Sequence, residues 1–364
     1  MQEDLNKLVP SASLEVDELN RLAADLSPEA FISLKRSILQ RYISDFDVIE
    51  NILKVNSHTW EVASIIKLEK EDWFKEGLAF LIEAFRLSKR ERKADLIDLL
   101  ESGYPSIHEA LNSYHDAFFL LNINEKSKLR HFARSCFRQM GDSIEATHKP
   151  YIELISNLVA IYRNLDGSHK KTSFGGNVSR LTEVDLFRKI YVDRLNGVPI
   201  NQWRNICQHS SYQTIPESNQ VKCDYGKDKE IILDKNEILF LMSRLDQLHT
   251  LHKIAIDFMV LDLSSELDLG VNLGMISMET IIGDLCSTLS TLQYPITEIK
   301  NEKKKLKISV VDRQGAGKKG LQYAMTQVSM LLIMLHKKGF SPIFGLYSKS
   351  GTKITEARLG GEFA

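Results

Sequence analysis

The sequence predicts a mainly α-helical protein with a small hairpin in its middle and a small α/β unit at its end. Three observations support this fold class. Apolar residues recur at helical spacing through most of the first 265 residues. Two short alternating runs, VKCDY and EIILD, flank GKDK in the pattern of a hairpin. Beyond residue 270, strand-like runs alternate with helical ones, which is typical of an α/β unit.

The first predicted region covers residues 1–130 and is helical throughout. From Glu15 to about Asn122, segments such as FISLKRSILQRYISDFDVIENIL and WFKEGLAFLIEAFRL place apolar side chains on one helical face. Short polar stretches such as SGYPS at 102–106 are expected to separate the helices.

The second predicted region, residues 131–265, is a helical bundle. Its helical pattern runs from LRHFARSCF to VAIYRNL, and Pro150 should kink the helix or start a new one. A loop is expected at 166–177, then a helix over LTEVDLFRKIYVDRL, an NGVP turn, the segment QWRNICQHSSY and the hairpin. A long helix from Asn236 to about Leu263 closes the region.

The third predicted region, residues 270–364, is a small basic α/β unit. We expect a helix near 275–293, a charged linker EIKNEKKK, a strand LKISVV, one helix through LQYAMTQVSMLLIMLHKK and a second strand near PIFGLY. From Ile296 onward there are 13 Lys or Arg against 5 Asp or Glu, an excess of +8. Because the net charge of the whole chain is −1, residues 1–295 carry a net charge of −9. This asymmetry predicts that an anionic partner binds the C-terminal region.

Composition narrows the class of protein. An apolar content of 43% fits a globular chain. The four cysteines, Cys136, Cys207, Cys223 and Cys286, form no CxxC pair, which argues against a zinc site and a disulfide framework and favours the reducing cytoplasm. The longest apolar run, MLLIML, is too short to span a membrane, and no targeting segment is expected.

The segment RNICQHSSY at 204–212 is the strongest candidate for a functional site. An arginine followed five or six positions later by a histidine occurs three times in the chain, so the spacing alone is not specific. Arg163 and His169 straddle a DGS turn, whereas Arg244 and the later histidine lie inside a long regular helix. Only Arg204 and His209 lie among other polar side chains on an amphipathic turn.

A helical projection divides that turn into two faces. At 100° per residue, one face is apolar and contains Trp203, Ile206 and Cys207, and the other is polar and contains Arg204, Asn205, Gln208 and His209. Arg204 and His209 are about 140° apart, so they do not neighbour each other directly but can bracket a ligand, with a second subunit completing the site. The alternative is an ordinary solvated helix face with a satisfied histidine.

These residue types suit a phosphodiester. Arginine donates in a fork to phosphate oxygens, and histidine exchanges a proton near neutral pH. Because RNA supplies its own nucleophile, the ribose 2′-OH, neither a metal nor another cofactor is expected. The histidine pair His249 and His252 shares a helix face, but no third ligand accompanies it, so a core or surface role is the preferred interpretation.

The order of elements over roughly 137–265, with the RN-x-x-x-H turn followed by a hairpin and a long helix, resembles a HEPN domain (higher eukaryotes and prokaryotes nucleotide-binding). The family motif maps onto Arg204, Asn205 and His209. The resemblance implies a metal-independent endoribonuclease that dimerises so that two motifs face one composite site. Many family members act as toxins or in defence against phage, which implies RNA, a second copy and an antitoxin or regulatory protein as partners.

A second candidate is VVDRQGAGKKGLQ at 310–322, which follows a strand and precedes a helix as a phosphate-binding loop does. It departs from the P-loop pattern because Asp312 replaces the first glycine and Lys319 replaces the magnesium-binding Ser or Thr. The alternatives are an ordinary turn at 310–322 and a solvated linker at KNEKKKLK, residues 300–307. The residues that we assign to phosphate or RNA contacts are Gln208 and five lysines: Lys303, Lys304, Lys305, Lys318 and Lys319.

Three functions follow from these patterns. The first is the RNA-cleaving toxin or antiphage effector. The second is a non-catalytic helical interaction protein that binds RNA or a nucleotide. The third is a nucleotide-binding enzyme that uses the GAGKKG loop.

Overall fold

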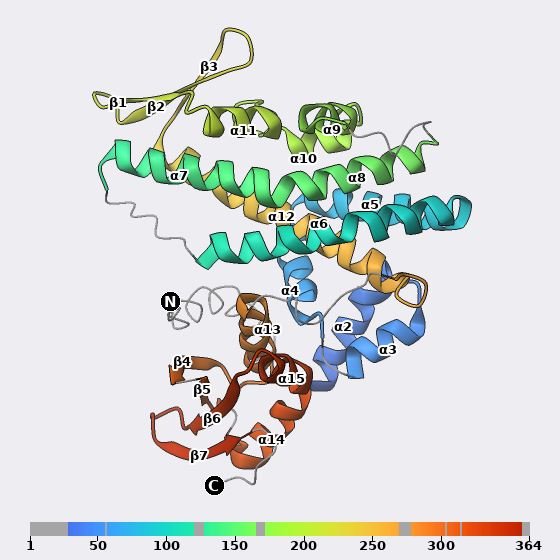
Figure 1. Cartoon of the computed structure of the whole chain (residues 1–364), viewed down its shortest axis with the longest axis vertical. Coiled ribbons are helices and arrows are strands. Elements are labelled where there is room, and N and C mark those ends of the chain that lie inside the picture. The colour runs from blue at the N-terminus through green and yellow to red at the C-terminus, as the bar shows by residue number, and fades with distance from the viewer. Residues whose placement is uncertain are drawn as a thin grey trace. The chain divides into compact units, whose positions relative to one another are not determined.

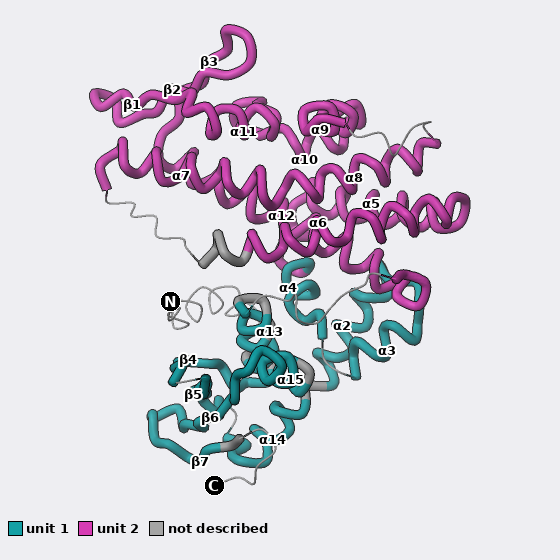
Figure 2. Tube along the Cα trace, viewed as in Figure 1, with its two compact units in different colours: residues 1–65, 270–364 teal, residues 66–269 magenta. Residues whose placement is uncertain are grey.

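The computed structural model describes residues 28–54, 57–119, 127–164, 172–268, 278–302, 304–313 and 315–358. The chain is mostly helical with two small sheets, so the predicted mainly α class is confirmed (Figure 1). It divides into two compact units, one formed by residues 66–269 and the other by 1–65 together with 270–364 (Figure 2). Within the described ranges, no helix has the length and apolar character needed to cross a membrane.

The unit of residues 66–269 is a helical bundle with a three-stranded sheet. Its helices are α5 (Asp72–Glu91), α6 (Lys93–Phe119), α7 (Leu129–Ser143), α8 (Lys149–Tyr162), α9 (Phe174–Thr182), α10 (Asp185–Tyr191), α11 (Ile200–Gln208) and α12 (Lys235–Asp262). The long helix predicted to close the region is confirmed as α12. Asp234 and Glu237 begin it with a capping box, in which each side chain accepts a backbone N–H of the other residue.

The helices α5 and α6 belong to this same unit. α5 packs against α8, α10 and α12, and α6 packs against α8 and α7. The sequence boundary near residue 130 therefore falls inside a unit, because the apolar faces of α5 and α6 are buried against the later helices.

The two prolines predicted to interrupt helices lie in different local structure. Pro150 lies in the first turn of α8, directly after the π-helical turn η2 (Ile144–His148), and the residues that join α7, η2 and α8 keep helical backbone angles, so the predicted irregularity is a π turn within a continuing helix. The predicted break at SGYPS is wrong, because α6 continues through Pro105. In this part of its length α6 packs closely on α8: a Cβ at Gly103 would lie 2.8 Å from Leu154 Cδ1.

The loop and helix predicted for residues 166–195 also need correction. Residues 165–171 lie outside the described ranges, but Phe174–Asn177 are the first turn of α9 rather than loop. The Ser173 hydroxyl caps that turn by accepting from Gly176 N–H at 3.1 Å. The single helix expected from residue 181 is divided between α9 and α10, with Val184 in extended conformation between them.

The hairpin is confirmed, with one more strand than predicted. β2 (Gln220–Tyr225) pairs antiparallel with β3 (Lys229–Leu233), and β1 (Tyr212–Ile215) pairs antiparallel with β2 on its other side. The ring of Tyr212 stacks on Phe137 of α7, with ring centroids 4.4 Å apart. This contact fixes the sheet against the bundle directly after α11.

The other unit contains α2 (Pro28–Tyr42), α3 (Phe46–Lys54), α13 (Met278–Thr291), α14 (Gly317–Gln327), α15 (Ser329–Lys337), β4 (Ile296–Glu302), β5 (Lys305–Val311), β6 (Ser341–Tyr347) and β7 (Lys353–Arg358). Helix α4 (Thr59–Leu68) crosses the boundary between the units along the chain. The four strands form one sheet in the order β4-β5-β6-β7.

The predicted β-α-β unit is confirmed, because β5 and β6 are parallel and α14 and α15 connect them. The prediction of a charged linker at 298–305 is wrong, because residues 298–302 belong to β4 and Lys305 begins β5, and these two strands pair antiparallel. The predicted single helix is two helices that meet at Val328.

Candidate functional site

Helix α11 carries the RNICQHSSY motif, and the preceding turn fixes where it begins. The Asp193 carboxylate accepts hydrogen bonds from three backbone N–H groups of this turn, at Leu195, Asn196 and Val198. It also accepts from Trp203 Nε1 at 3.1 Å. One carboxylate therefore joins the turn to the apolar face of α11, where Ile200, Trp203, Ile206 and Cys207 are buried as the helical projection predicted.

Helix α11 packs closely on α7 at Gly141. A Cβ at this glycine would lie 2.9 Å from Cys207 Cβ and 3.4 Å from Gln208 Nε2. Cys207 Cβ is bonded directly to the backbone of α11, so it cannot turn away as the end of a flexible side chain would. The absence of a side chain at residue 141 thus sets the depth at which α11 lies.

His209 is the C-cap of α11 and is exposed. Its backbone N–H donates to Asn205 O at 3.0 Å. The next residue, Ser210, has a positive φ of 52°, and the N–H groups of Ser210 and Ser211 donate to Cys207 O and Ile206 O. This is the Schellman arrangement, which ends the helix and projects the imidazole from its last turn.

Arg204 is anchored by a carboxylate from η2. Its Nε donates to Glu145 Oε2 at 2.8 Å, and its Nη1 donates to Asn205 Oδ1 at 3.4 Å. The other oxygen of Glu145 accepts from Lys149 Nζ. The terminal Nη2 donates no hydrogen bond to any other described residue, and both Arg204 and Glu145 are one-third exposed. The guanidinium is thus held at Nε and Nη1, which belong to two different edges of the group, and Nη2 is the nitrogen without a described partner.

This network keeps Glu145 charged. Burial raises the pKa of the Glu145 carboxyl, but hydrogen bonds and positive charge from Lys149 and Arg204 outweigh it, so the pKa lies below its ordinary value. Glu145 is not among the site residues that the sequence predicts. The only signal for it was a carboxylate four residues before Lys149 on a helix, a spacing too common to indicate a site.

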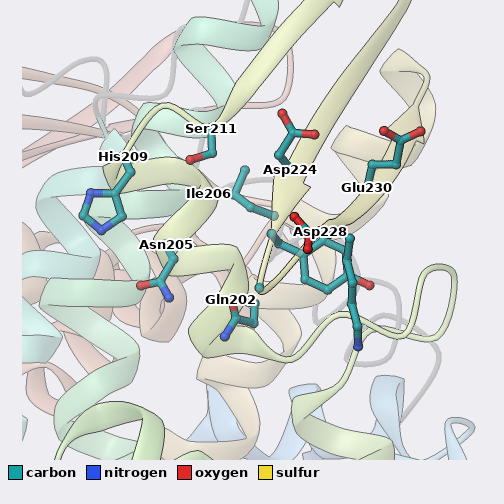
Figure 3. Close-up of a pocket in the computed structure, with 11 residues that line it drawn as sticks. Gln202, Asn205, Ile206, His209, Ser211, Asp224, Asp228 and Glu230 are labelled. Carbon is teal, nitrogen blue, oxygen red and sulfur yellow. The ribbon is translucent and has the colours of Figure 1, made fainter.

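A pocket of about 720 Å³ lies between α11 and the three-stranded sheet (Figure 3). From α11 and its end come Gln202, Asn205, Ile206, His209 and Ser211, and from the hairpin come Asp224, Tyr225, Gly226, Asp228, Lys229 and Glu230. The three carboxylates exceed the one lysine in number, so the pocket is acidic. The sequence does not predict this acidic side of the pocket, because the register of β2 and β3 brings its residues together.

The predicted site residues divide into two groups. His209 and Asn205 line the pocket, whereas Arg204 and Gln208 do not. Among the described residues, no hydrogen bond joins Arg204 to His209, as their separation around the helix leads one to expect. Asn205 is the link, because its Oδ1 accepts from Arg204 while its side chain borders the pocket.

The histidine pair on α12 lies in the core rather than in this site. His249 and His252 are fully buried, and His148 from η2 packs against both, with ring centroids 6.4 Å and 6.1 Å away. Tyr191 Oη lies 2.9 Å from His252 Nε2. Burial lowers the pKa of His148 to about 3, and burial and then the nearby His148 lower that of His252 well below its ordinary value.

The GAGKKG loop is closed by its own aspartate. The buried Asp312 carboxylate accepts from Gly315 N–H at 2.7 Å and Gly317 N–H at 2.6 Å. These are amides of the loop that leads into α14, where a phosphate-binding loop would use its N–H groups for the ligand. Lys318 and Lys319 are exposed on the first turn of α14.

Of the other lysines predicted to bind RNA, Lys304, with a φ of 70°, directly precedes β5, and Lys305 is the first residue of that strand. Both are exposed, and Lys303 lies outside the described residues. On the strands of the same sheet, Lys300, Lys307 and Lys353 each form an ion pair with a glutamate, at 2.9, 2.6 and 2.9 Å. These three glutamates are among the five acidic residues already subtracted in the excess of +8, so the pairing shows where positive charge is neutralised and leaves the excess unchanged.

Comparisons with protein-family models, with curated proteins and with solved structures found no match to this chain. Within the described ranges, no three His, Cys, Asp or Glu side chains lie together as a metal site requires.

Proposed function

We propose that this protein is a metal-independent endoribonuclease of the HEPN type that acts in the cytoplasm as a toxin or antiphage effector. The observation that carries the proposal is the anchored Arg204. Glu145 and Asn205 accept hydrogen bonds from Nε and Nη1 of its guanidinium, and Nη2 is left for a phosphate oxygen. The order of helices, hairpin and long closing helix supports the proposal further, since it resembles that family.

In this mechanism His209 transfers protons and Arg204 binds the phosphate. The imidazole accepts the proton of the ribose 2′-OH or donates one to the leaving oxygen, while the guanidinium stabilises the negative charge that grows on the phosphorus oxygens. Asn205 orients Arg204 through the hydrogen bond at 3.4 Å. Glu145 is a positioning residue, because it acts only through Arg204.

The test is cleavage of single-stranded RNA by the full chain in EDTA. His209→Ala should lower the rate about 100-fold or more while leaving RNA binding largely intact, because the imidazole moves protons rather than holding the strand. Arg204→Lys should also fail, since an ammonium keeps the charge and loses the planar fork. Asn205→Ala should do less harm. The product should end in a cyclic phosphate.

Matched controls come from α7. His131→Ala removes an exposed histidine outside the pocket, and Arg138→Lys changes an exposed arginine whose partner is Asp142. Both should cut RNA like the wild type. Cleavage that stops in EDTA, or a His209→Ala protein as fast as wild type, would leave the non-catalytic interaction protein as the better interpretation.

The composite site requires two copies of the chain. Arg204 and His209 do not meet within one copy, so the proposal includes a homodimer through the unit of residues 66–269. Mixed dimers of Arg204→Lys and His209→Ala chains should recover partial activity, because the composite site then keeps one native Arg204 from one copy and one native His209 from the other. A monomeric mass at micromolar concentration, or no recovery in the mixture, contradicts this part of the proposal.

Lys303, Lys304 and Lys305 are proposed to strengthen RNA binding without sequence preference. Charge reversal at Lys303, Lys304 and Lys305 should lower affinity and flatten its dependence on salt, since fewer counterions are released. Unchanged affinity and slope would contradict this role. An antitoxin or other regulatory partner remains a prediction.

A further inference from the structure

The pocket beside His209 has a chemistry that the cleavage of a phosphodiester does not explain. Asp224, Asp228 and Glu230 line it, and ionised carboxylates accept hydrogen bonds but donate none. Phosphate oxygens are also acceptors and carry negative charge, so the pocket repels the backbone of RNA. A ligand that fits must instead present N–H donors.

The three carboxylates differ in how far they are already engaged. Glu230 pairs with Lys222 at 2.5 Å, and Asp224 lies 3.8 Å from the same lysine. Asp228, at the β2–β3 turn with a φ of 56°, makes no hydrogen bond or ion pair with another described residue. Asp228 is therefore the carboxylate most open to a ligand.

The remaining lining suits a planar heterocycle. Tyr225 offers an aromatic face, with Lys229 Nζ 5.9 Å from its ring centroid. Gln202 and Asn205 have side-chain amides that both donate and accept, and they lie on the opposite, α11 side of the pocket (Figure 3). Unpaired bases of single-stranded RNA are recognised by this combination of stacking and hydrogen bonds to their edges.

We propose that the pocket binds the nucleobase next to the cleaved phosphate and prefers guanine. Guanine has two adjacent donors on its Watson–Crick edge, N1–H and N2–H₂, which match the two oxygens of Asp228. Adenine and cytosine present one amino group there, and uracil presents only N3–H. This inference rests on the proposed function for the position of the phosphate, but base binding can be measured without cleavage.

The experiment uses the full chain and four labelled oligonucleotides that are uracil throughout except for one central G, A, C or U. All carry 2′-deoxy sugars, so they cannot be cleaved through the 2′-OH. The guanine strand should bind roughly 5- to 100-fold more tightly than the uracil strand, the range expected for one bidentate contact. Asp228→Asn should remove this preference, and asparagine tolerates the positive φ of the turn.

The control is Glu217→Gln, which removes an exposed carboxylate from the β1–β2 turn outside the pocket. Its preference for guanine should match the wild type. Tyr225→Leu should weaken all four strands, because stacking is nearly independent of the base.

The sign of the Asp228→Asn effect separates base recognition from simple charge. If the carboxylate only repels RNA, its removal strengthens binding of all four strands, and that outcome overturns the inference. Equal affinities of the four strands for the wild type also overturn it. Cleavage of the matching all-ribose strands tests the proposed function separately: a guanine preference without cleavage supports this inference and contradicts the nuclease.

Discussion

Glu145 contacts the first of the two segments that the sequence predicts to bind phosphate, and Asp312 lies within the second; the two carboxylates have opposite consequences. Glu145 accepts a hydrogen bond from Arg204 Nε and leaves Nη2 available. Asp312 binds the amides of Gly315 and Gly317, which are the donors that a phosphate would need. A sequence pattern can therefore bind phosphate only through the N–H groups that do not already donate a hydrogen bond within the protein.

The two compact units, which each contain one of these carboxylates, should differ most in how their stability responds to acid. His148 and His252 are buried without charge in the unit of residues 66–269, whereas the described histidines of the other unit, His58 and His336, are not buried. Below the unfolded pKa of about 6.5, the unfolded chain binds protons that these folded side chains do not. The free energy of unfolding of this unit should fall by about 1.4 kcal/mol per histidine per pH unit.

Amide hydrogen exchange at pH 7 and pH 5, corrected for the intrinsic rate, checks this prediction segment by segment. Protection should decrease in α8 and α12 and remain in β5 and β6. Equal losses in both units would show that the buried histidines do not determine the acid response.

The second prediction compares the two carboxylates directly. Asp312→Ala should lower the free energy of unfolding by about 1–3 kcal/mol, because it leaves loop amides without their acceptor. Glu145→Ala should cost at most about 1 kcal/mol, because its ion pair with Arg204 is one-third exposed. Yet Glu145→Ala should lower RNA cleavage through misplacement of Arg204, and Glu145→Gln should restore part of it. Urea unfolding and cleavage rates measure the two effects, and a reversed order of stabilities would contradict the comparison.

The third prediction concerns the packing that positions α11. Gly141→Ala should cost about 1–3 kcal/mol, because its Cβ would lie 2.9 Å from Cys207 Cβ and α11 must move. In the other unit, Gly283→Ala meets no atom within 4 Å and lies within α13, so it should be neutral or slightly stabilising. Thermal unfolding of both variants checks the contrast, and equal melting temperatures would refute it.

The smallest effect is expected at Ser210. Glycine adopts positive φ without the cost that a Cβ imposes, so Ser210→Gly should stabilise the protein by up to about 1 kcal/mol. Cleavage should change little, since the Schellman hydrogen bonds use the backbone. A lower melting temperature for this variant would mean that the serine side chain contributes more than its backbone conformation costs.

The sequence predicts the periodic parts of this fold and misses the parts that long-range contacts determine. The core face of α11 and the long helix α12 follow from spacing alone. The helix through Pro105 and the strand β4 do not, because packing on α8 in one case and pairing with β5 in the other override the local signals. In the candidate site, Arg204 and His209 belong to one short motif, whereas Glu145 comes from η2 and Asp228 from the β2–β3 turn, so only the folded chain brings them to the site.

The π-helical turn at Ile144–His148 changes the phase of the helix that carries it. A π turn contains one residue more than an α turn, so every side chain after it is rotated by about 100° relative to an uninterrupted helix. Deleting one residue there would convert the π turn into an α turn and leave the side chains of Lys149 and the rest of α8 on the same side of the bundle. The extra residue is therefore accommodated locally, within the turn whose Glu145 contacts Arg204 and whose His148, three positions later, lies in the core.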